Sequence, residues 1–237
     1  MADVWGLWNQ NVSLKQLRQS TQVLCAAGKW ADKDETIFAS IPTHGKAGMV
    51  KEIWGWMDKA DVIISYNGMR FDVPHLNREF LELGLSPPSP YKQIDLLKTS
   101  KSKFRFPSNK LDYIAQTLGI GKKVDHAGHQ LWVDCMVGDM DAWEKMEEYN
   151  REDVILTEKL YYRFLPWISA HPNPALYKGV DEGSCSKCGS PRTIKRGFVY
   201  TKVGKLQRYR CESCGGWSQG RKNVAENKNL LTTIAGY

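Results

Sequence analysis

The stretch Tyr66-Asn67-Gly68-Met69-Arg70-Phe71-Asp72-Val73-Pro74 joins a predicted strand to a predicted helix. Residues 61–66 form a short apolar, β-branched run of strand length, and the Asn-Gly pair supplies the turn that ends it. Pro74 suits the first position of a helix because it lacks an N–H group and has a fixed φ, and Gly84 is a typical helix stop. Asp72 is therefore predicted at a strand-to-helix junction, where it could bind a cation or only stabilise the helix N-terminus.

A second stretch, Tyr149-Asn150-Arg151-Glu152-Asp153, lies within a longer helical pattern. Apolar side chains recur at helical spacing over residues 141–164, which predicts one long helix or two abutting ones. Tyr149 and Asp153 are four residues apart, so they share one helical face. Such a pair on its own is common and usually structural.

Together, the two stretches resemble the second and third motifs of the DEDD superfamily of 3′-5′ exonucleases. The tyrosine-bearing branch, which includes the proofreading domains of family B DNA polymerases, has Tyr-Asn-x-x-x-Phe-Asp-x-Pro-x-Leu as its second motif, and residues 66–76 match it. Its third motif, Tyr-x-x-x-Asp, matches residues 149–153. The other branch has a histidine where this chain has Glu148. The resemblance covers roughly residues 1–165.

The resemblance implies an α/β, ribonuclease H-like fold, with a mixed sheet and flanking helices, and phosphodiester hydrolysis by two metal ions. Asp72 and Asp153 would bind Mg²⁺ or Mn²⁺, which prefer hard oxygen ligands, and Tyr149 would help orient the attacking water. Asn67 and Phe71 would position the terminal nucleotide or support the site. The expected partner is nucleic acid, as single strands or 3′ ends, and the choice between DNA and RNA stays open.

The first motif of the family, Asp-x-Glu on the opening strand, has no counterpart before Tyr66. Residues 1–8 look like the second strand of the fold, so the first strand is expected to be missing. The acidic segment 32–35 lies between two apolar runs, residues 22–30 and 36–39, and is better explained as a polar hairpin turn. A start at an internal methionine is the favoured explanation, because losing the central strand would make the sheet hard to stabilise. An inactive nuclease kept for binding, in a phage or mobile-element replication or recombination complex, and an acidic pair supplied from elsewhere are the alternatives.

Four cysteines near the C-terminus have the spacing of a structural zinc site. Cys185-x-x-Cys188 and Cys211-x-x-Cys214 are separated by two predicted strands, residues 193–201 and 206–211, which is typical of a zinc ribbon. Disulfides are the alternative, but the sequence shows no secretory signal and no apolar run long enough to cross a membrane. We therefore expect a reducing, cytoplasmic setting, in a bacterium or a phage-infected cell.

The excess positive charge of the chain lies near the cysteines. Residues 181–237 contain 11 Lys or Arg and 4 Asp or Glu, whereas residues 1–180 contain 22 of each kind. This excess favours nucleic-acid binding by the ribbon, with aromatic side chains available to stack on unpaired bases. A solvated basic face, with the aromatic residues filling a small core, is the alternative. The candidate nucleic-acid contacts are Lys195, Arg196, Arg208, Tyr209 and Arg210.

The predicted organisation has four parts. Residues 1–170 form the N-terminally incomplete ribonuclease H-like domain, and residues 171–183, which are broken by prolines, form a linker. Residues 184–216 form the zinc ribbon, and residues 217–237 form a polar tail without recognisable chemistry.

Overall fold

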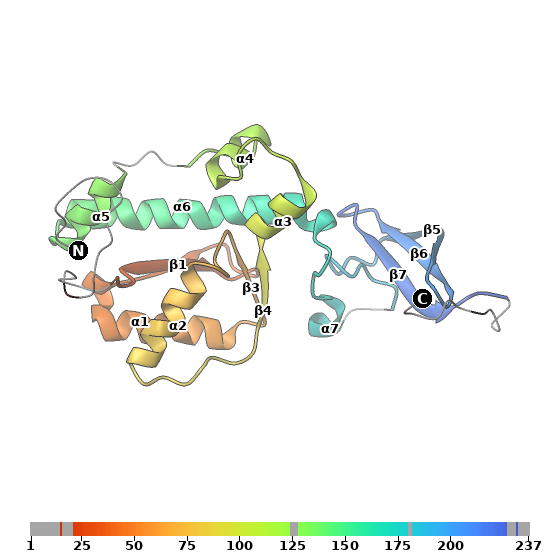
Figure 1. Cartoon of the computed structure of the whole chain (residues 1–237), viewed down its shortest axis with the longest axis horizontal. Coiled ribbons are helices and arrows are strands. Elements are labelled where there is room, and N and C mark those ends of the chain that lie inside the picture. The colour runs from red at the N-terminus through yellow and green to blue at the C-terminus, as the bar shows by residue number, and fades with distance from the viewer. Residues whose placement is uncertain (1–14, 16–20, 124–127, 180–181, 227–230, 232–237) are drawn as a thin grey trace. The chain divides into compact units, whose positions relative to one another are not determined.

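The computed structural model describes residues 15, 21–123, 128–179, 182–226 and 231 (Figure 1). It divides into two compact units, the first built from Met1–Ile63, Asn67–Tyr91 and Lys123–Ile155, and the second from Ile64–Tyr66, Lys92–Lys122 and Leu156–Tyr237. The elements are a mixture of helices and small sheets, which confirms the predicted α/β class. The predicted strand at residues 1–8 lies outside the described residues.

The first unit opens with a hairpin. Strands β1 (Cys25–Lys29) and β2 (Thr36–Ser40) pair antiparallel, with Cys25 opposite Ser40 and Lys29 opposite Thr36. The acidic segment 32–35 lies in the connection between them, as predicted for a polar turn. Helix α1 (Ile41–Lys59) follows directly and is kinked at Gly45, whose φ of 65° is accessible mainly to glycine.

Helix α2 (Asp72–Glu82) contacts α1 in the same unit. It begins at Asp72, two residues before the start that was predicted at Pro74, because the turn at residues 67–71 already supplies the first backbone bonds of the helix. It ends before Gly84, which has a φ of 69° as expected of a helix stop. The buried core of this region comes from β2, α1 and α2: Ala39, Met49, Val50, Ile53, Met57 and Phe80.

A second core cluster joins α5 (His129–Met136) to the N-terminal part of α6 (Met140–Phe164). The predicted helix over residues 141–164 is confirmed as a single element (Figure 1). Leu24 and Cys25, at the start of the hairpin, pack against this cluster, so α6 and the hairpin share apolar contacts. Its buried members are Leu131, Cys135, Ala142, Trp143 and Met146.

The second unit contains a small sheet and the C-terminal part of α6. Strand β3 (Val62–Ser65) pairs with β4 (Lys92–Asp95), and α3 (Leu96–Lys103) and α4 (Leu111–Thr117) follow. Asp95 begins α3 by accepting a hydrogen bond from the Leu97 N–H at 2.9 Å. The Phe104 ring contacts Phe164, the last residue of α6, at a centroid distance of 4.9 Å. It also contacts Trp167, in the short 3₁₀ helix Leu165–Trp167, at 5.5 Å.

The C-terminal part of the second unit is a three-stranded antiparallel sheet in the order β5 (Thr193–Tyr200), β6 (Lys205–Cys211) and β7 (Trp217–Asn223) (Figure 1). Strands β5 and β6 match the predicted pair. Strand β7 lies in the stretch that was predicted to be a polar tail, so that boundary was wrong. Its residues are polar but pair with β6 through the backbone, which needs no apolar pattern. A short helix, α7 (Ala175–Lys178), lies within the predicted linker.

Candidate nuclease and zinc sites

Tyr149 and Asp153 both contact the Lys123 ammonium. Both lie on α6 one turn apart, and the Lys123 ammonium donates a hydrogen bond to the Tyr149 hydroxyl at 3.0 Å and forms an ion pair with the Asp153 carboxylate at 2.7 Å. The same ammonium lies 4.8 Å from the centroid of the Tyr149 ring. The predicted pair therefore shares one face and one partner, and Lys123 is a site residue that sequence reasoning missed.

The pKa values of Lys123 and Tyr149 are both raised above their usual values. Burial alone lowers the pKa of Lys123, but the hydrogen bonds to Asp153 and Tyr149 outweigh it and raise that pKa above its usual value. Burial also raises the pKa of the Tyr149 phenol, although the Lys123 hydrogen bond acts against the rise. At neutral pH the site therefore holds a charged ammonium beside a neutral phenol.

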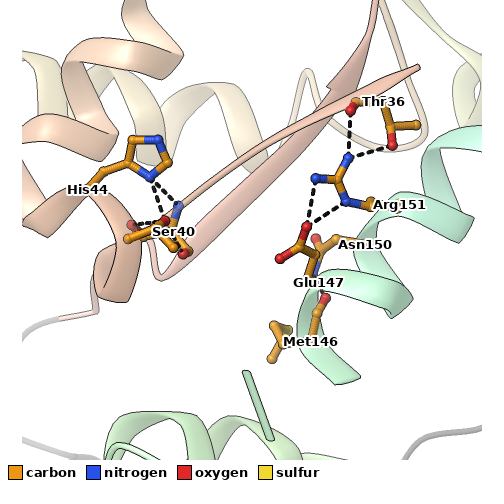
Figure 2. A network of polar contacts seen from close by, with 8 residues as sticks. Thr36, Ser40, His44, Met146, Glu147, Asn150 and Arg151 are labelled. Atoms are coloured by element: carbon orange, nitrogen blue, oxygen red, sulfur yellow. Dashed lines mark hydrogen bonds and ion pairs between the residues drawn. The ribbon is translucent and has the colours of Figure 1, made fainter. Parts of the chain in front are cut away.

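The two residues after Tyr149 fasten α6 to the hairpin (Figure 2). Arg151 bonds the Glu147 carboxylate through Nε at 2.7 Å and Nη2 at 2.6 Å, and its Nη1 donates to the backbone oxygen of Thr36 at 2.5 Å. The Asn150 amide donates to the Met146 backbone oxygen at 2.8 Å and contacts the Cys25 sulfur at 3.6 Å. The motif thus points Asn150 and Arg151 toward the hairpin and presents Tyr149 and Asp153 to Lys123.

Asn67, Phe71 and Asp72 lie in a tight turn that opens α2. Asn67 has a φ of 70°, and its backbone oxygen accepts hydrogen bonds from the N–H groups of Arg70 and Phe71 at 3.2 and 3.1 Å. Asparagine tolerates this left-handed conformation better than most residues, which gives Asn67 a structural reason to occupy the position. The Phe71 side chain is 58% exposed, and its ring meets His75 edge-on at 4.9 Å. Asp72 is exposed at the first position of the helix.

The described carboxylates do not by themselves form a metal cluster. Within the residues that the structure describes, the only group of three or more potential ligands with closely spaced ligand atoms is the cysteine cluster. Asp72 and Asp153 belong to no such group, and Asp153 is paired with Lys123. The geometry of these residues therefore defines no complete site for Mg²⁺ or Mn²⁺.

The four predicted zinc ligands, in contrast, converge. The sulfur atoms of Cys185, Cys188, Cys211 and Cys214 all lie within 4.8 Å of one another, and the Cys185–Cys214 and Cys188–Cys211 sulfur pairs are 3.7 Å apart. A tetrahedral zinc ion with Zn–S bonds of about 2.3 Å requires sulfur atoms roughly 3.8 Å apart. The cluster therefore fits a metal such as zinc.

Each cysteine pair lies on the same kind of turn. The N–H of Gly189 donates to Cys185 O at 2.9 Å, the N–H of Gly215 donates to Cys211 O at 3.0 Å, and both glycines have a φ of 75°. Burial alone raises the pKa of Cys211, but hydrogen bonds from backbone N–H groups and neighbouring thiols outweigh it and lower that pKa to about 7.

A buried lysine connects the first turn to the segment that follows the 3₁₀ helix Leu165–Trp167. Lys187 lies between the first two cysteines, is 9% exposed, and donates a hydrogen bond from Nζ to the backbone oxygen of Ile168. Burial lowers the pKa of Lys187. The sequence offered no signal for this contact, because a lysine within a Cys-x-x-Cys pair usually faces solvent.

The candidate nucleic-acid contacts of the ribbon lie on two neighbouring strands. Lys195 and Arg196 belong to β5, and Arg208, Tyr209 and Arg210 belong to β6. Tyr209 is half-buried and the four basic residues are exposed. The strands hold all five in one sheet, but alternation divides those of β6 between its two faces.

Comparison with known proteins assigns the N-terminal part of the chain to a family. The model of a family described as the RNase_H superfamily matches residues 15–165, which is more than half of the chain. The chain therefore belongs to the RNase H superfamily, and its mixed α/β elements are ribonuclease H-like, as predicted. This relationship supports a nuclease-like function.

One curated relative is Protein NEN3 of Arabidopsis thaliana. It is 29% identical over 137 residues, which are 54% of this chain and 26% of NEN3, so the chain spans about a quarter of that protein's length.

Among the described residues, no helix is both long enough and apolar enough to span a membrane.

Proposed function

We propose that the protein is a 3′-5′ exonuclease of the tyrosine-bearing DEDD branch, which hydrolyses phosphodiester bonds of DNA or RNA with two Mg²⁺ or Mn²⁺ ions. The observation that carries the proposal is that the Tyr149 hydroxyl and the Asp153 carboxylate both contact the Lys123 ammonium. The phenol and the carboxylate of the third motif therefore lie side by side. Membership of the RNase H superfamily supports the same class of reaction.

In this proposal the motif residues have separate tasks. Asp72 and Asp153 bind metal, and the phenol of Tyr149, which stays protonated at neutral pH, orients the attacking water by hydrogen bonding. The exposed ring of Phe71 is placed to stack on a terminal base. Asn67 holds the turn that puts Phe71 and Asp72 at the start of α2.

The ribbon has a supporting role. Four cysteines with sulfur spacings that suit zinc, in the region that carries the excess positive charge, support a zinc-bound module that helps hold single-stranded substrate. Its candidate contacts are Lys195, Arg196, Arg208, Tyr209 and Arg210.

The second candidate function is an inactive nucleic-acid-binding module, which could serve in a phage or mobile-element replication or recombination complex. The Lys123–Asp153 ion pair favours it, because an ammonium already occupies the carboxylate that a metal ion would need. This candidate predicts salt-sensitive binding without turnover.

A hydrolysis assay separates the two candidates. The full chain is incubated with 5′-labelled single-stranded DNA or RNA and Mn²⁺ or Mg²⁺, and products are resolved at single-nucleotide length. An exonuclease shortens the strand one nucleotide at a time from the 3′ end. We expect Asp72→Asn and Asp153→Asn each to lower the rate at least about 100-fold, and Tyr149→Phe roughly tenfold or more.

The matched control is Glu152→Gln, which removes a charge from the exposed neighbour of Asp153 and should change the rate less than about twofold. Hydrolysis that survives both aspartate substitutions would reject the assigned site. Binding of the strand with no hydrolysis under either metal would support the inactive module instead.

A further inference from the structure

The register of the ribbon sheet sorts its basic and aromatic side chains onto two faces. Side chains alternate along a strand, so Arg208 and Arg210 of β6 lie on one face, and Lys205 and Tyr209 lie on the other. Residues paired directly across strands share a face. Trp217 pairs with Arg210, and Gln219 pairs with Arg208.

We call the first of these the arginine–tryptophan face, made of Arg208, Arg210, Trp217 and Gln219. We call the opposite face the lysine–tyrosine face. It contains the cross-strand pairs Lys195–Tyr209, Phe198–Gln207 and Tyr200–Lys205. The contacts between side chains agree with this division, because Arg208 lies over Trp217, and Lys205 lies over Phe198 and Tyr200.

The arginine–tryptophan face presents fixed groups to solvent. The Arg208 guanidinium carbon lies 4.8 Å from the Trp217 ring centroid, and its Nε donates to the backbone oxygen of Arg196 at 2.8 Å. Trp217 is 47% exposed, and Arg208 and Arg210 are both exposed. A guanidinium held in this way loses little freedom when it binds a further group.

The lysine–tyrosine face holds its half-buried cation against aromatic rings, although Phe198 and Tyr200 are 37% and 73% exposed. The Lys205 ammonium lies 4.1 Å from the Phe198 ring centroid and 6.0 Å from that of Tyr200, and the lysine is half-buried. A Cβ added at Gly220 would lie 3.7 Å from the Tyr209 ring, an ordinary contact distance, so the ring lies against β7. The Lys205 ammonium therefore already contacts the rings beside it, which leaves it less available to a phosphate.

We propose that the arginine–tryptophan face is the main surface by which the ribbon binds single-stranded nucleic acid. The inference rests on the proposed nucleic-acid role of the ribbon and specifies where that role resides. Arg208 and Arg210 are two positions apart on one strand, roughly 7 Å, so their planar forks reach different phosphates. The exposed indole of Trp217 beside them offers a stacking surface for an unpaired base. The excess positive charge of this region suits a polyanion.

The test compares matched substitutions on the two faces of the zinc-loaded full chain. Binding of fluorescently labelled oligodeoxythymidylate and oligouridylate is followed by anisotropy at several salt concentrations, without Mg²⁺ or Mn²⁺ so that no strand is hydrolysed. Arg210→Ala should weaken binding roughly tenfold and lower the slope of log K against log salt by about 1. Trp217→Ala should weaken binding roughly tenfold with the slope unchanged.

The controls are Lys205→Ala and Tyr200→Ala, which remove a cation and an aromatic ring from the other face and should each change affinity less than about twofold. Zinc content and circular dichroism check that every variant is folded, and Arg210→Lys and Trp217→Phe, with smaller expected losses, replace any variant that is not. Equal losses from both faces, a larger loss from Lys205→Ala or Tyr200→Ala, or no binding by the unmodified chain would overturn the inference.

The same variants in the hydrolysis assay keep this result separate from the proposed exonuclease activity. Face-specific binding without hydrolysis by the unmodified chain would reject the exonuclease and keep the inference. Hydrolysis without face-specific binding would reject the inference and keep the exonuclease. Comparison of the thymidylate and uridylate strands shows whether the face distinguishes DNA from RNA.

Discussion

Glu79 is a buried carboxylate with several polar partners, and it anchors the helix that begins with Asp72. It is 1% exposed, accepts a hydrogen bond from the Val23 N–H at 3.1 Å, and forms ion pairs with Arg78 at 3.0 Å and Lys46 at 3.2 Å. A charge at such a position is tolerated only when several partners compensate its lost hydration. Glu79 therefore ties α2 to α1 and to the segment before β1.

Replacing Glu79 by glutamine should lower the free energy of unfolding at pH 7 by about 1–3 kcal/mol, because the buried N–H and the two cations lose a charged acceptor. Burial alone raises the pKa of Glu79, but the Val23, Arg78 and Lys46 contacts outweigh it and lower that pKa below 4.5. A carboxylate whose pKa is lower in the folded state stabilises that state at pH values above its unfolded-state pKa. This stabilisation is lost as the pH falls through the folded-state pKa.

Denaturant unfolding at several pH values checks this expectation. The difference between the unmodified protein and Glu79→Gln should shrink as pH falls below about 4.5. Glu82→Gln is the control, since that carboxylate is half exposed and pairs only with Arg78 at 3.5 Å. A difference that stays constant from pH 7 to pH 3 would contradict the role assigned to the Glu79 charge.

At the scale of elements, α6 combines two functions in one motif. Its Tyr149 and Asp153 side contacts Lys123, and its Arg151 side reaches Thr36 at the start of β2 (Figure 2). The hairpin thereby fixes the rotation of the helix about its own axis. A helix free to rotate would not keep its Tyr149 and Asp153 face turned toward Lys123.

We expect Arg151→Ala to lower the free energy of unfolding by about 1–3 kcal/mol, because it removes hydrogen bonds to Thr36 and Glu147. Chemical denaturation measures the change. Arg163→Ala, in the exposed last turn of the same helix, is the matched control and should change stability by less than about 0.5 kcal/mol. Equal effects of the two substitutions would show that the hairpin contact contributes nothing.

At the scale of the whole molecule, the two ends of the chain are stabilised differently. Among the residues that the structure describes, the first unit has two clusters of buried apolar side chains, whereas the buried apolar residues of the ribbon are Cys185 and Cys211. A module with so small a core depends on a metal or disulfides for its stability. The ribbon should therefore fold only with its metal ion bound.

Removal of zinc should unfold β5–β7 and leave the first unit folded. The purified chain should contain about one zinc ion, and a strong chelator should collapse the amide signals of the ribbon strands in two-dimensional NMR spectra while those of α1 and α2 persist. Cys185→Ser should abolish stoichiometric zinc binding. Cys135→Ala, at a buried cysteine outside the cluster, should keep it. Ribbon signals that survive complete zinc removal would contradict this dependence.

Local patterns predicted part of this structure and failed at identifiable places. The strand at residues 61–66, the long helix and the ribbon hairpin follow from short-range periodicity. Helix α1 was missed because Gly45 and Gly48 interrupt its helical pattern, and the helix bends at the first of them. Strand β7 was missed because its pairing partner, and not its own polar side chains, makes it a strand.

The sequence by itself determined the spacings that carry the chemistry: Tyr149 and Asp153 are four positions apart, and a hairpin separates two Cys-x-x-Cys pairs. Such spacings fix geometry because a helical turn and a tight turn are local structures. The tertiary structure alone decided that Lys123 meets both α6 residues, that Lys187 is buried against Ile168, and that the ribbon arginines share a face with Trp217. These contacts join residues far apart in the chain, so they depend on how distant elements pack and have no signature in any single segment.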